Sequence, residues 1–401
     1  MASEPQLQQQ AFQALDNFQI EIPSWGFANT GTRFGKFIQA AAASTIEEKF
    51  ADAAEVHRLT GSTPTMALHV LWDLPNGLAD IENVKALEKQ HGIRSGSINP
   101  NLFQDQQYKF GSLCNPSAEI RALALSHVLT SIQIGAQLNT RDISLWLADG
   151  SNYPGTQSMR RRIGWLEDSL QQAHAHLNSS QRLLVEYKPF EPAFYHTDIA
   201  DWGMALHLAR NAGPQARGLV DTGHHYAGQN IEQIVTWLIH TGALGGFHFN
   251  DRRYADDDLT LGSIDPYQVF RIFHEIHSAN TDGRAPGFSL KDIAFMIDQS
   301  HNLKGKIEAM VQTVVTAQEL WLKAALVDRE QLAVLQEKCD LVAAEELFRG
   351  AFWQDVRPLA AEWRAARNLP ADPLCALRKS GYVERITKER SGKQSSGNTY
   401  A

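Results

Sequence analysis

Eight short runs rich in apolar residues recur along the chain, and longer segments with helical periodicity separate most of them. These segments, such as residues 230–244, place apolar residues three and four positions apart. Strands that alternate with helices pair in parallel, and eight such units predict a closed (β/α)8 barrel, the TIM barrel. The runs are Ile20–Gly26, Thr65–Asp73, Gly96–Asn101, Asp142–Gly150, Arg182–Phe190, Arg217–His225, Gly245–Asp251 and Ala294–Asn302. The third run is the least typical strand, because it contains a proline.

The pattern differs on both sides of the barrel, which we place at residues 20–302. Residues 1–19 are predicted to form an N-terminal helical segment. Residues 303–385 are typical of long amphipathic helices with no strands between them. We expect them to pack against a neighbouring subunit, since they carry more large apolar residues than a barrel needs; capping the barrel is the alternative. Residues 386–401 are polar and small, which predicts a disordered tail.

The composition indicates where the protein is located and which classes of partner it does not bind. The formal net charge of −8 disfavours a nucleic acid held through phosphate contacts. Three widely spaced cysteines form neither a disulfide framework nor a CxxC metal site, and they fit a reducing cytosol. The N-terminus does not have the pattern of a signal peptide, and no apolar run is long enough to span a membrane. We therefore expect a cytoplasmic protein without a membrane partner.

Polar and aromatic residues gather at the carboxyl end of each predicted strand. In a barrel of parallel strands these ends meet at one rim, which is the rim that carries active sites. Any one such residue is more typical of a cap or a turn, so only their joint occurrence is informative. The residues, from the first run to the eighth, are Trp25; His69, Trp72 and Asp73; Asn99 and Asn101; Trp146 and Asp149; Glu186 and Lys188; Asp221, His224 and His225; His248, Asn250 and Asp251; and Asp298, Gln299 and His301.

The last four runs bring carboxylates and imidazoles together without a thiolate. Such a cluster repels itself unless a cation neutralises it, and its ligand types suit Mn²⁺, Mg²⁺, Co²⁺ or Zn²⁺. The simplest allocation has two metal sites. The first is formed by Glu186, Asp221, His248 and Asp298. Glu186 bridges to the second, which is held by His224 and Asp256, with Asp258 as a further candidate ligand. The second site is the looser one because it lies on loops.

The other side of the rim is aromatic and neutral. Aromatic faces beside groups that reach hydroxyls suit a sugar, whereas packing near the barrel top is the alternative and is strongest for Trp72. The aromatic residues are Trp25, Trp72, Phe103 and Trp146, and the polar ones are His69 and Asn99.

Six motifs in order resemble the bacterial L-rhamnose isomerases, in particular the broad-specificity type that also handles D-allose. They are "IPSWGFANTGTRF", "WLADGSNYPG", "EYKPFEPAFY", "LVDTGHH", "GGFHFND" and "MIDQSHN", and the likeness extends from about Ile20 to Tyr382. That family is one of the xylose-isomerase-like barrels. Phe, Ala and Asn in the first and second motifs depart from the smaller residues expected there, which leaves the preferred sugar open.

The resemblance implies a homotetramer with two divalent metal ions per subunit, usually Mn²⁺. It implies interconversion of L-rhamnose and L-rhamnulose, and of aldoses such as D-allose with D-psicose. It also supports the two ligand sets above and places Lys188 near the reacting carbonyl. It implies that His69, Trp25 and Trp146 shape the sugar pocket and that Phe34 enters it from a neighbouring subunit. The candidate catalytic residues are Lys188, Asp298 and His69.

The sequence leaves the mechanism and three competing functions open. Isomerisation proceeds through a 1,2-hydride shift or through proton transfer by an enediol. A metal-dependent hydrolase on the same barrel needs a phosphate-attracting surface, which the net charge does not provide. A one-metal epimerase needs two carboxylates facing each other across the substrate. A sugar-binding barrel without catalysis needs no two-metal cage. For His225 we expect a supporting hydrogen bond or a packing role.

Overall fold

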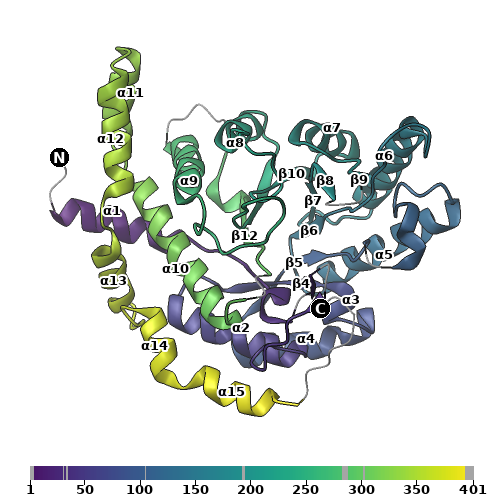
Figure 1. The fold of residues 1–401 in the computed structure, drawn as a ribbon, viewed down its shortest axis with the longest axis horizontal. Coiled ribbons are helices and arrows are strands. Elements are labelled where there is room, and N and C mark those ends of the chain that lie inside the picture. The colour runs from purple at the N-terminus through teal and green to yellow at the C-terminus, as the bar shows by residue number, and fades with distance from the viewer. Residues whose placement is uncertain are drawn as a thin grey trace.

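A computed structural model of the chain describes residues 4–29, 31–32, 35–103, 105–191, 195–281, 288–300 and 303–392. Eight parallel strands form one sheet in the order β1-β4-β5-β6-β7-β10-β11-β12 (Figure 1). A parallel bridge between Glu21 and Met296 joins the two ends of the sheet, so the predicted TIM barrel is confirmed. The strands are β1 (Ile22–Pro23), β4 (Thr65–His69), β5 (Arg94–Asn99), β6 (Asp142–Leu145), β7 (Arg182–Glu186), β10 (Ala216–Asp221), β11 (Leu244–Phe249) and β12 (Ala294–Ile297).

A helix follows each barrel strand and returns the chain to the opposite end of the barrel. Several begin at a side-chain cap; Thr45, for example, accepts from the backbone N–H of Glu48 and starts the first of them. The helices are α2 (Ile46–Thr60), α4 (Ile81–His91), α5 (Ala118–Gln137), α6 (Met159–Ala175), α7 (Trp202–Ala212), α8 (Ile231–His240), α9 (Pro266–Thr281) and α10 (Lys306–Ala325).

The regular strands are shorter than the apolar runs. The first run turns at Ser24 into a short 3₁₀ helix, η1 (Ser24–Phe27). The second leaves the sheet after His69 and forms α3 (Val70–Asp73). Asp73 accepts a hydrogen bond of 2.8 Å from the backbone N–H of His69, which favours this helical turn over further strand. The prediction that Trp72 and Asp73 end a strand is therefore wrong, because both lie on α3.

Inside the barrel an apolar layer lies below the rim. Leu184, Leu219, Ala294 and Met296 form a buried cluster separate from the large core between strands and helices. Gly246 belongs to the same layer, since a Cβ atom there would lie 2.6 Å from the backbone oxygen of Ala294. The residue two positions further along each strand shares the inward face. That rule places Glu186, Asp221, His248 and Asp298 directly above the apolar layer.

Further helices lie outside the barrel. α1 (Glu4–Asp16) precedes it, and α10 packs on α9, α1 and α2. Helix α15 extends to Arg390, so residues 386–390 are helical, whereas residues 393–401 lie outside the described part. α11 and α12 project from one end of the molecule (Figure 1), with Leu341, Val342 and Trp353 exposed on α12. The five C-terminal helices are α11 (Arg329–Glu337), α12 (Leu341–Trp353), α13 (Arg357–Ala365), α14 (Pro373–Ser380) and α15 (Tyr382–Arg390).

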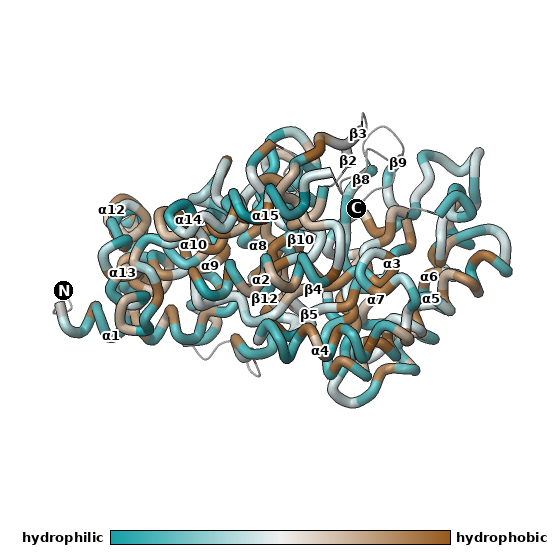
Figure 2. Tube along the Cα trace, turned by 90° about the horizontal axis from the view of Figure 1, so that it is seen from below, coloured by the Kyte–Doolittle hydropathy of each residue, from teal (hydrophilic) through white to brown (hydrophobic). Residues whose placement is uncertain are grey.

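Polar and apolar residues are distributed as expected for a barrel with an amphipathic outer layer. Helix α15 runs along the lower edge of the molecule in Figure 1, and it is mostly hydrophilic (Figure 2). Within the residues that the structure describes, no helix combines the length and apolar character needed to cross a membrane.

Two short hairpins lie at the rim formed by the carboxyl ends of the strands. The first consists of β2 (Gly31–Thr32) and β3 (Gly35–Lys36). Phe34, which the family resemblance places in the sugar pocket of a neighbouring subunit, lies outside the described residues. The second consists of β8 (Phe190–Glu191) and β9 (Tyr195–His196). This second hairpin follows β7 and therefore lies beside Glu186 and Lys188.

Candidate functional site

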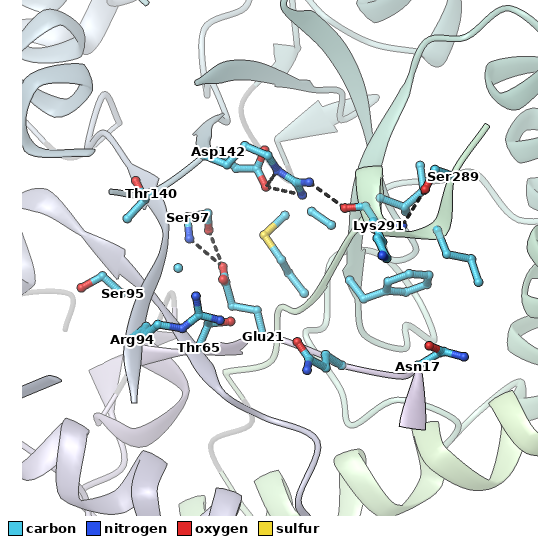
Figure 3. Close-up of a pocket in the computed structure, with 18 of the residues that line it drawn as sticks. Asn17, Glu21, Thr65, Arg94, Ser95, Ser97, Thr140, Asp142, Ser289 and Lys291 are labelled. Atoms are coloured by element: carbon cyan, nitrogen blue, oxygen red, sulfur yellow. Dashed lines mark hydrogen bonds and ion pairs between the residues drawn. The ribbon is translucent and has the colours of Figure 1, made fainter. Parts of the chain in front are cut away.

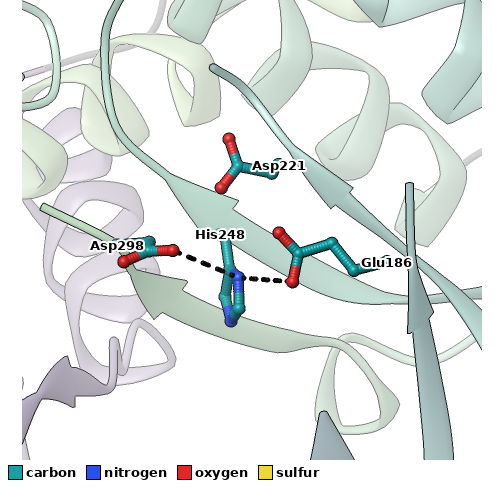
Figure 4. Close-up of side chains that lie close together, drawn as sticks. All are labelled: Glu186, Asp221, His248 and Asp298. Carbon is teal, nitrogen blue, oxygen red and sulfur yellow. Dashed lines mark ion pairs between the residues drawn. The ribbon is translucent and has the colours of Figure 1, made fainter. Parts of the chain in front are cut away.

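Four side chains from four consecutive barrel strands converge at the rim (Figure 4). Each offers one ligand atom, and these atoms all lie within 4.8 Å of one another. Nδ1 of His248 lies 3.1 Å from Oε2 of Glu186 and 3.6 Å from Oδ2 of Asp298. The fourth member is Asp221 at the end of β10. The structure thus brings together the four residues of the first predicted metal set.

Neighbouring polar groups fix the orientation of these carboxylates. The side-chain amide of Asn250 donates to both oxygens of Asp221, at 3.0 and 3.1 Å, and the backbone N–H of Gly223 donates at 2.6 Å. Nε1 of Trp25 donates to Oδ1 of Asp298 at 2.8 Å. The sequence pattern places Asn250 at a strand end but predicts no specific role for it, although it follows His248 by two residues and so shares its side of the strand.

The chemistry of the cluster fits a divalent cation. Oε2 of Glu186 and both ring nitrogens of His248 are buried without a hydrogen-bond partner among the described residues. Nδ1 of His248 and Oε2 of Glu186 are therefore close but not aligned for a hydrogen bond, as expected of two ligands that point to a shared ion. Buried polar atoms left unpaired are costly, and a bound cation would satisfy them together.

The pKa values of the clustered residues also indicate a site built for a cation. Burial alone would raise the pKa of Glu186, but the nearby His248 and His224 together outweigh burial and bring the value to about 2. Burial opposes protonation of His248, yet the carboxylates of Glu186, Asp298 and Asp221 together raise its pKa to about 9. Burial raises the pKa of Asp221 to about 7. Without a cation the cluster therefore retains protons at neutral pH, and binding of a divalent ion would release them.

A second group lies on loops next to the first. His224 joins the two, because Nδ1 lies 3.2 Å from Oε1 of Glu186 and Nε2 lies 3.3 Å from Oδ1 of Asp256. Nδ1 also lies 3.1 Å from the carbonyl oxygen of Tyr187. Since a carbonyl can only accept, that contact places the hydrogen of a neutral ring on Nδ1 and leaves Nε2 free to bind a cation.

Asp258 lies at the edge of this second group. Its backbone adopts a left-handed φ of 46°, and its Oδ2 accepts a 2.7 Å hydrogen bond from the hydroxyl of Ser300. Burial raises the pKa of Asp258 well above its ordinary value, and the charges of Asp256 and Asp298 add to that rise. The fold thus brings Asp256 and Asp258 close to each other and to the rim.

The aromatic wall forms a continuous chain of rings opposite the carboxylates. The ring of His69 lies 4.7 Å from Trp25, 4.2 Å from Trp72 and 5.8 Å from Phe103, centre to centre. Phe103 in turn lies 4.7 Å from Trp146. The wall contacts the charged side at two points: Trp25 binds Asp298, and the ammonium of Lys188 lies 5.0 Å from the ring centre of Trp146.

His69 is held in the neutral form within this wall. Burial lowers its pKa to about 3. Its Nδ1 and the Nε1 of Trp146 are buried without a hydrogen-bond partner in the described residues, so both are available to a bound ligand. Below His69, Asp73 accepts a hydrogen bond from the backbone of His69 and forms a buried 2.7 Å ion pair with Lys49.

His225 has a supporting contact in place of a ligand position. Its Nε2 lies 2.7 Å from the hydroxyl of Tyr187, whose carbonyl oxygen contacts His224. Burial lowers the pKa of His225 to about 3, so its ring is neutral. The two successive histidines therefore diverge: His224 points to the carboxylates, whereas His225 anchors the loop on Tyr187.

A separate hollow of about 710 Å³ lies at the other end of the barrel (Figure 3). Thr65, Arg94, Asp142 and Ala294, which line it, are the first residues of their strands. Its polar groups largely pair with one another; Glu21, for example, accepts from both the backbone N–H and the hydroxyl of Ser97. Barrel enzymes carry their chemistry at the opposite face, so the rim cluster remains the candidate site.

Comparison with known proteins places this architecture in a family. Residues 59–283 match the family model described as xylose isomerase-like TIM barrel. The chain is also 39% identical over 381 residues to a protein of Mesorhizobium japonicum named "Probable sugar isomerase", covering 94% of this chain and 87% of that one. The chain belongs to the xylose isomerase-like TIM barrel family. A second protein with that name, from Rhizobium meliloti, is 39% identical over 376 residues, covering 92% of this chain and 86% of the relative.

Solved structures of other proteins share this fold at low sequence identity. The crystal structure of D-allulose 3-epimerase from Methylomonas sp. in complex with D-allulose has a TM-score of 0.54 and 13% identity, covering 74% of this chain and 95% of that one. The family match at residues 59–283 includes Glu186, Asp221 and His248. Trp25 and Asp298 lie on either side of it, so strands at both ends of the barrel complete the cluster.

Proposed function

We propose that this protein is a metal-dependent aldose–ketose isomerase. The observation that carries the proposal is the cluster of Glu186, Asp221, His248 and Asp298, with buried unpaired ligand atoms, facing an aromatic wall. Carboxylates and an imidazole suit a hard divalent ion, and rings beside unpaired polar atoms suit a sugar. Two relatives named "Probable sugar isomerase" support the same reaction class.

We further propose L-rhamnose and L-rhamnulose as the principal pair, with D-allose and D-psicose as further substrates. The support is the resemblance of six motifs to broad-specificity L-rhamnose isomerases. Four of these motifs supply proposed metal ligands at the rim: "LVDTGHH", "EYKPFEPAFY", "GGFHFND" and "MIDQSHN".

The proposed enzyme holds two divalent ions, most simply Mn²⁺. Glu186, Asp221, His248 and Asp298 would hold the first, and Glu186 would bridge to a second held by His224, Asp256 and Asp258. The 3.2 Å and 3.3 Å contacts of His224 with Glu186 and Asp256 support the second set. When bound, such ions supply Lewis acidity that polarises the oxygens of the open-chain sugar.

The protein's own residues orient the sugar and stabilise charge. Lys188 presents a buried ammonium that would stabilise negative charge on the reacting carbonyl oxygen. Nδ1 of neutral His69 and Nε1 of Trp146 would pair with hydroxyls. Trp25, Trp72 and Phe103 would cover the apolar face of the sugar and exclude water. Asp298 is the candidate base if the proton moves through an enediol, whereas a 1,2-hydride shift needs none at carbon.

We also propose that the subunits form a homotetramer, in which Phe34 enters the sugar pocket of a neighbouring subunit. The exposed apolar side chains of α12, Leu341, Val342 and Trp353, support association through the C-terminal helices. Light scattering coupled to gel filtration tests this directly. A monomeric mass at micromolar concentration would contradict it.

A metal measurement followed by a product assay tests the function. The purified protein should contain divalent metal, and it should convert L-rhamnose, D-allose, L-mannose or D-xylose to the ketose in a reaction that a chelator abolishes. Ketose converted only to an epimeric ketose would identify an epimerase and overturn the proposal. Stoichiometric solvent deuterium at C1 of the product would exclude a pure hydride shift and favour the enediol.

A further inference from the structure

Lys188 is fixed in place at its backbone. It lies two residues beyond Glu186, and its side chain is 4% exposed. Its backbone N–H donates to the carbonyl oxygen of Ile199 at 2.9 Å, and its own carbonyl accepts from the hydroxyl of Thr197. The backbone of Lys188 is therefore fixed, and the position of its ammonium depends on the side-chain rotamer and on the carboxylates that bind it.

The ammonium of Lys188 is shared between two carboxylates. Nζ lies 2.8 Å from Oε2 of Glu191 and 2.7 Å from Oδ2 of Asp256. Only Oδ2 of Asp256 is engaged in this way. Oδ1 is buried, has no hydrogen-bond partner among the described residues, and lies 3.3 Å from Nε2 of His224. Asp256 thus presents a single oxygen towards the proposed second cation.

Glu191 is itself held by the hairpin that it lies on. It pairs with Tyr195 across β8 and β9. The adjacent Phe190 stacks on Tyr226 with ring centres 5.6 Å apart, which joins the hairpin to the loop that carries His224. The side chain of Glu191 is 24% exposed, so this carboxylate lies at the edge of the site.

We infer that Glu191 is a positioning residue: it holds the Lys188 ammonium so that Lys188 binds Oδ2 of Asp256 and leaves Oδ1 for the second cation. This inference rests on the proposed function, which supplies that cation. Without the Glu191 charge, Asp256 is the only carboxylate among the described residues that pairs with the ammonium. The ammonium then binds Asp256 more closely and competes with the second cation for the charge of that carboxylate. The second cation then binds more weakly, whereas the first set of ligands is unchanged.

Calorimetric titration of the metal-free protein with Mn²⁺ tests this. The unaltered protein should show a tight and a weaker site. Glu191→Gln should weaken the second site about 10-fold, as expected for a partner of a ligand, and leave the first within about twofold. Glu191→Asp keeps the charge but shortens the reach, so its second-site affinity should lie between those two.

A double-mutant cycle separates this role from a general effect of charge. If Glu191 acts through Lys188, then Glu191→Gln should have no further effect once Lys188→Gln is present. An equal loss of affinity in both backgrounds would mean that Glu191 acts through space, and would overturn the inference. Glu232→Gln is a matched control, because Glu232 forms a 2.7 Å ion pair with Arg271 away from the site and is 20% exposed.

The outcomes distinguish this inference from the proposed function. Two Mn²⁺ sites in the unaltered protein, with no change in Glu191→Gln, would overturn the inference and leave the function standing. A single Mn²⁺ site in the unaltered protein would overturn the two-metal proposal and this inference with it. Metal-free Glu191→Gln protein should unfold at the temperature of the unaltered protein, because Lys188 keeps its pair with Asp256. A lower unfolding temperature would indicate a fold defect and would contradict a pure positioning role.

Discussion

Nε1 of Trp25 donates a 2.8 Å hydrogen bond to Oδ1 of Asp298, a residue 273 positions later in the chain. This bond joins the turn after the first barrel strand to the end of the last one. It also joins the aromatic wall to the carboxylate cluster, since the ring of Trp25 packs against His69. One side chain therefore orients a proposed metal ligand and forms part of the proposed sugar pocket.

Trp25→Phe should lower both metal affinity and catalytic efficiency. Phenylalanine keeps a ring in the wall but leaves Asp298 without its donor, which should cost about 10- to 100-fold in kcat/KM or in Mn²⁺ affinity. Steady-state assays with L-rhamnose and metal titration measure the two effects. Trp363→Phe is the matched control, because Trp363 donates a comparable 3.0 Å bond to Asp16 outside the barrel rim. Full activity and full metal affinity in Trp25→Phe would contradict this role.

Asn250→Ala should weaken the first metal site. The amide of Asn250 donates to both oxygens of Asp221, so its loss leaves that carboxylate free to rotate. Loss of such a partner typically costs about 10- to 100-fold in metal affinity. Competition with a chelator of known affinity measures it. Asn115→Ala removes a buried amide that binds the carbonyl of Gly111 instead, and it should leave the metal affinity unchanged. Equal affinities in the two variants would show that Asn250 does not orient Asp221.

Removal of the metal should abolish activity and lower thermal stability together. A ligand that binds only the native state stabilises it by about 2.7 kcal/mol at a concentration 100 times its Kd. Chelation should therefore lower the unfolding temperature, and added Mn²⁺ should restore both stability and activity. In Asp221→Asn, which lacks one proposed ligand, the unfolding temperature should depend far less on Mn²⁺. An unaltered protein that is equally stable with and without metal would argue against a built cation site.

His274 should make the protein less stable as the pH falls below 6.5. Burial lowers the pKa of His274 to about 4 from an ordinary value of 6.5. Between these values the unfolded chain binds the proton and the native chain does not, so stability present above pH 6.5 is lost on acidification. Between these two values, His274 by itself should change the free energy of unfolding by about 1.4 kcal/mol per pH unit. Urea unfolding of metal-free protein at pH 7, 6 and 5 measures it, and His274→Gln should flatten the slope. An identical slope in that variant would exclude His274 as the cause.

Arg390→Gln should destabilise the docking of the C-terminal helix. Arg390 and Asp52 form a buried ion pair of 2.8 Å, and both side chains are at most 4% exposed. Removing one partner leaves a buried unpaired charge, which costs about 3–5 kcal/mol. Denaturant unfolding measures the loss, and limited proteolysis should cleave α15 sooner. Arg385→Gln removes only a surface pair with Glu389 and should cost less than about 0.5 kcal/mol. Equal losses in the free energy of unfolding for the two substitutions would show that the Arg390–Asp52 ion pair does not stabilise the docking of α15.

The sequence predicts the barrel and much of the cluster because both depend on local periodicity. Alternation of strand and helix patterns fixes parallel pairing, and the spacing of two residues fixes which side chains share the inward face. Leu184 and Glu186, and likewise Leu219 and Asp221, follow that rule. Conversely, the second apolar run does not reveal its helical turn, because α3 depends on the side chain of Asp73 reaching back to His69.

What the sequence determined by itself is therefore the order of the strands and the identity of the inward-facing residues at the ends of the last four strands. The tertiary structure decided which distant groups complete them: Trp25 with Asp298, Lys188 with Glu191 and Asp256, and Arg390 with Asp52. The physical reason is range. Strand and helix periodicity arises between residues a few positions apart, whereas these hydrogen bonds and ion pairs depend on where loops and terminal helices return to the barrel.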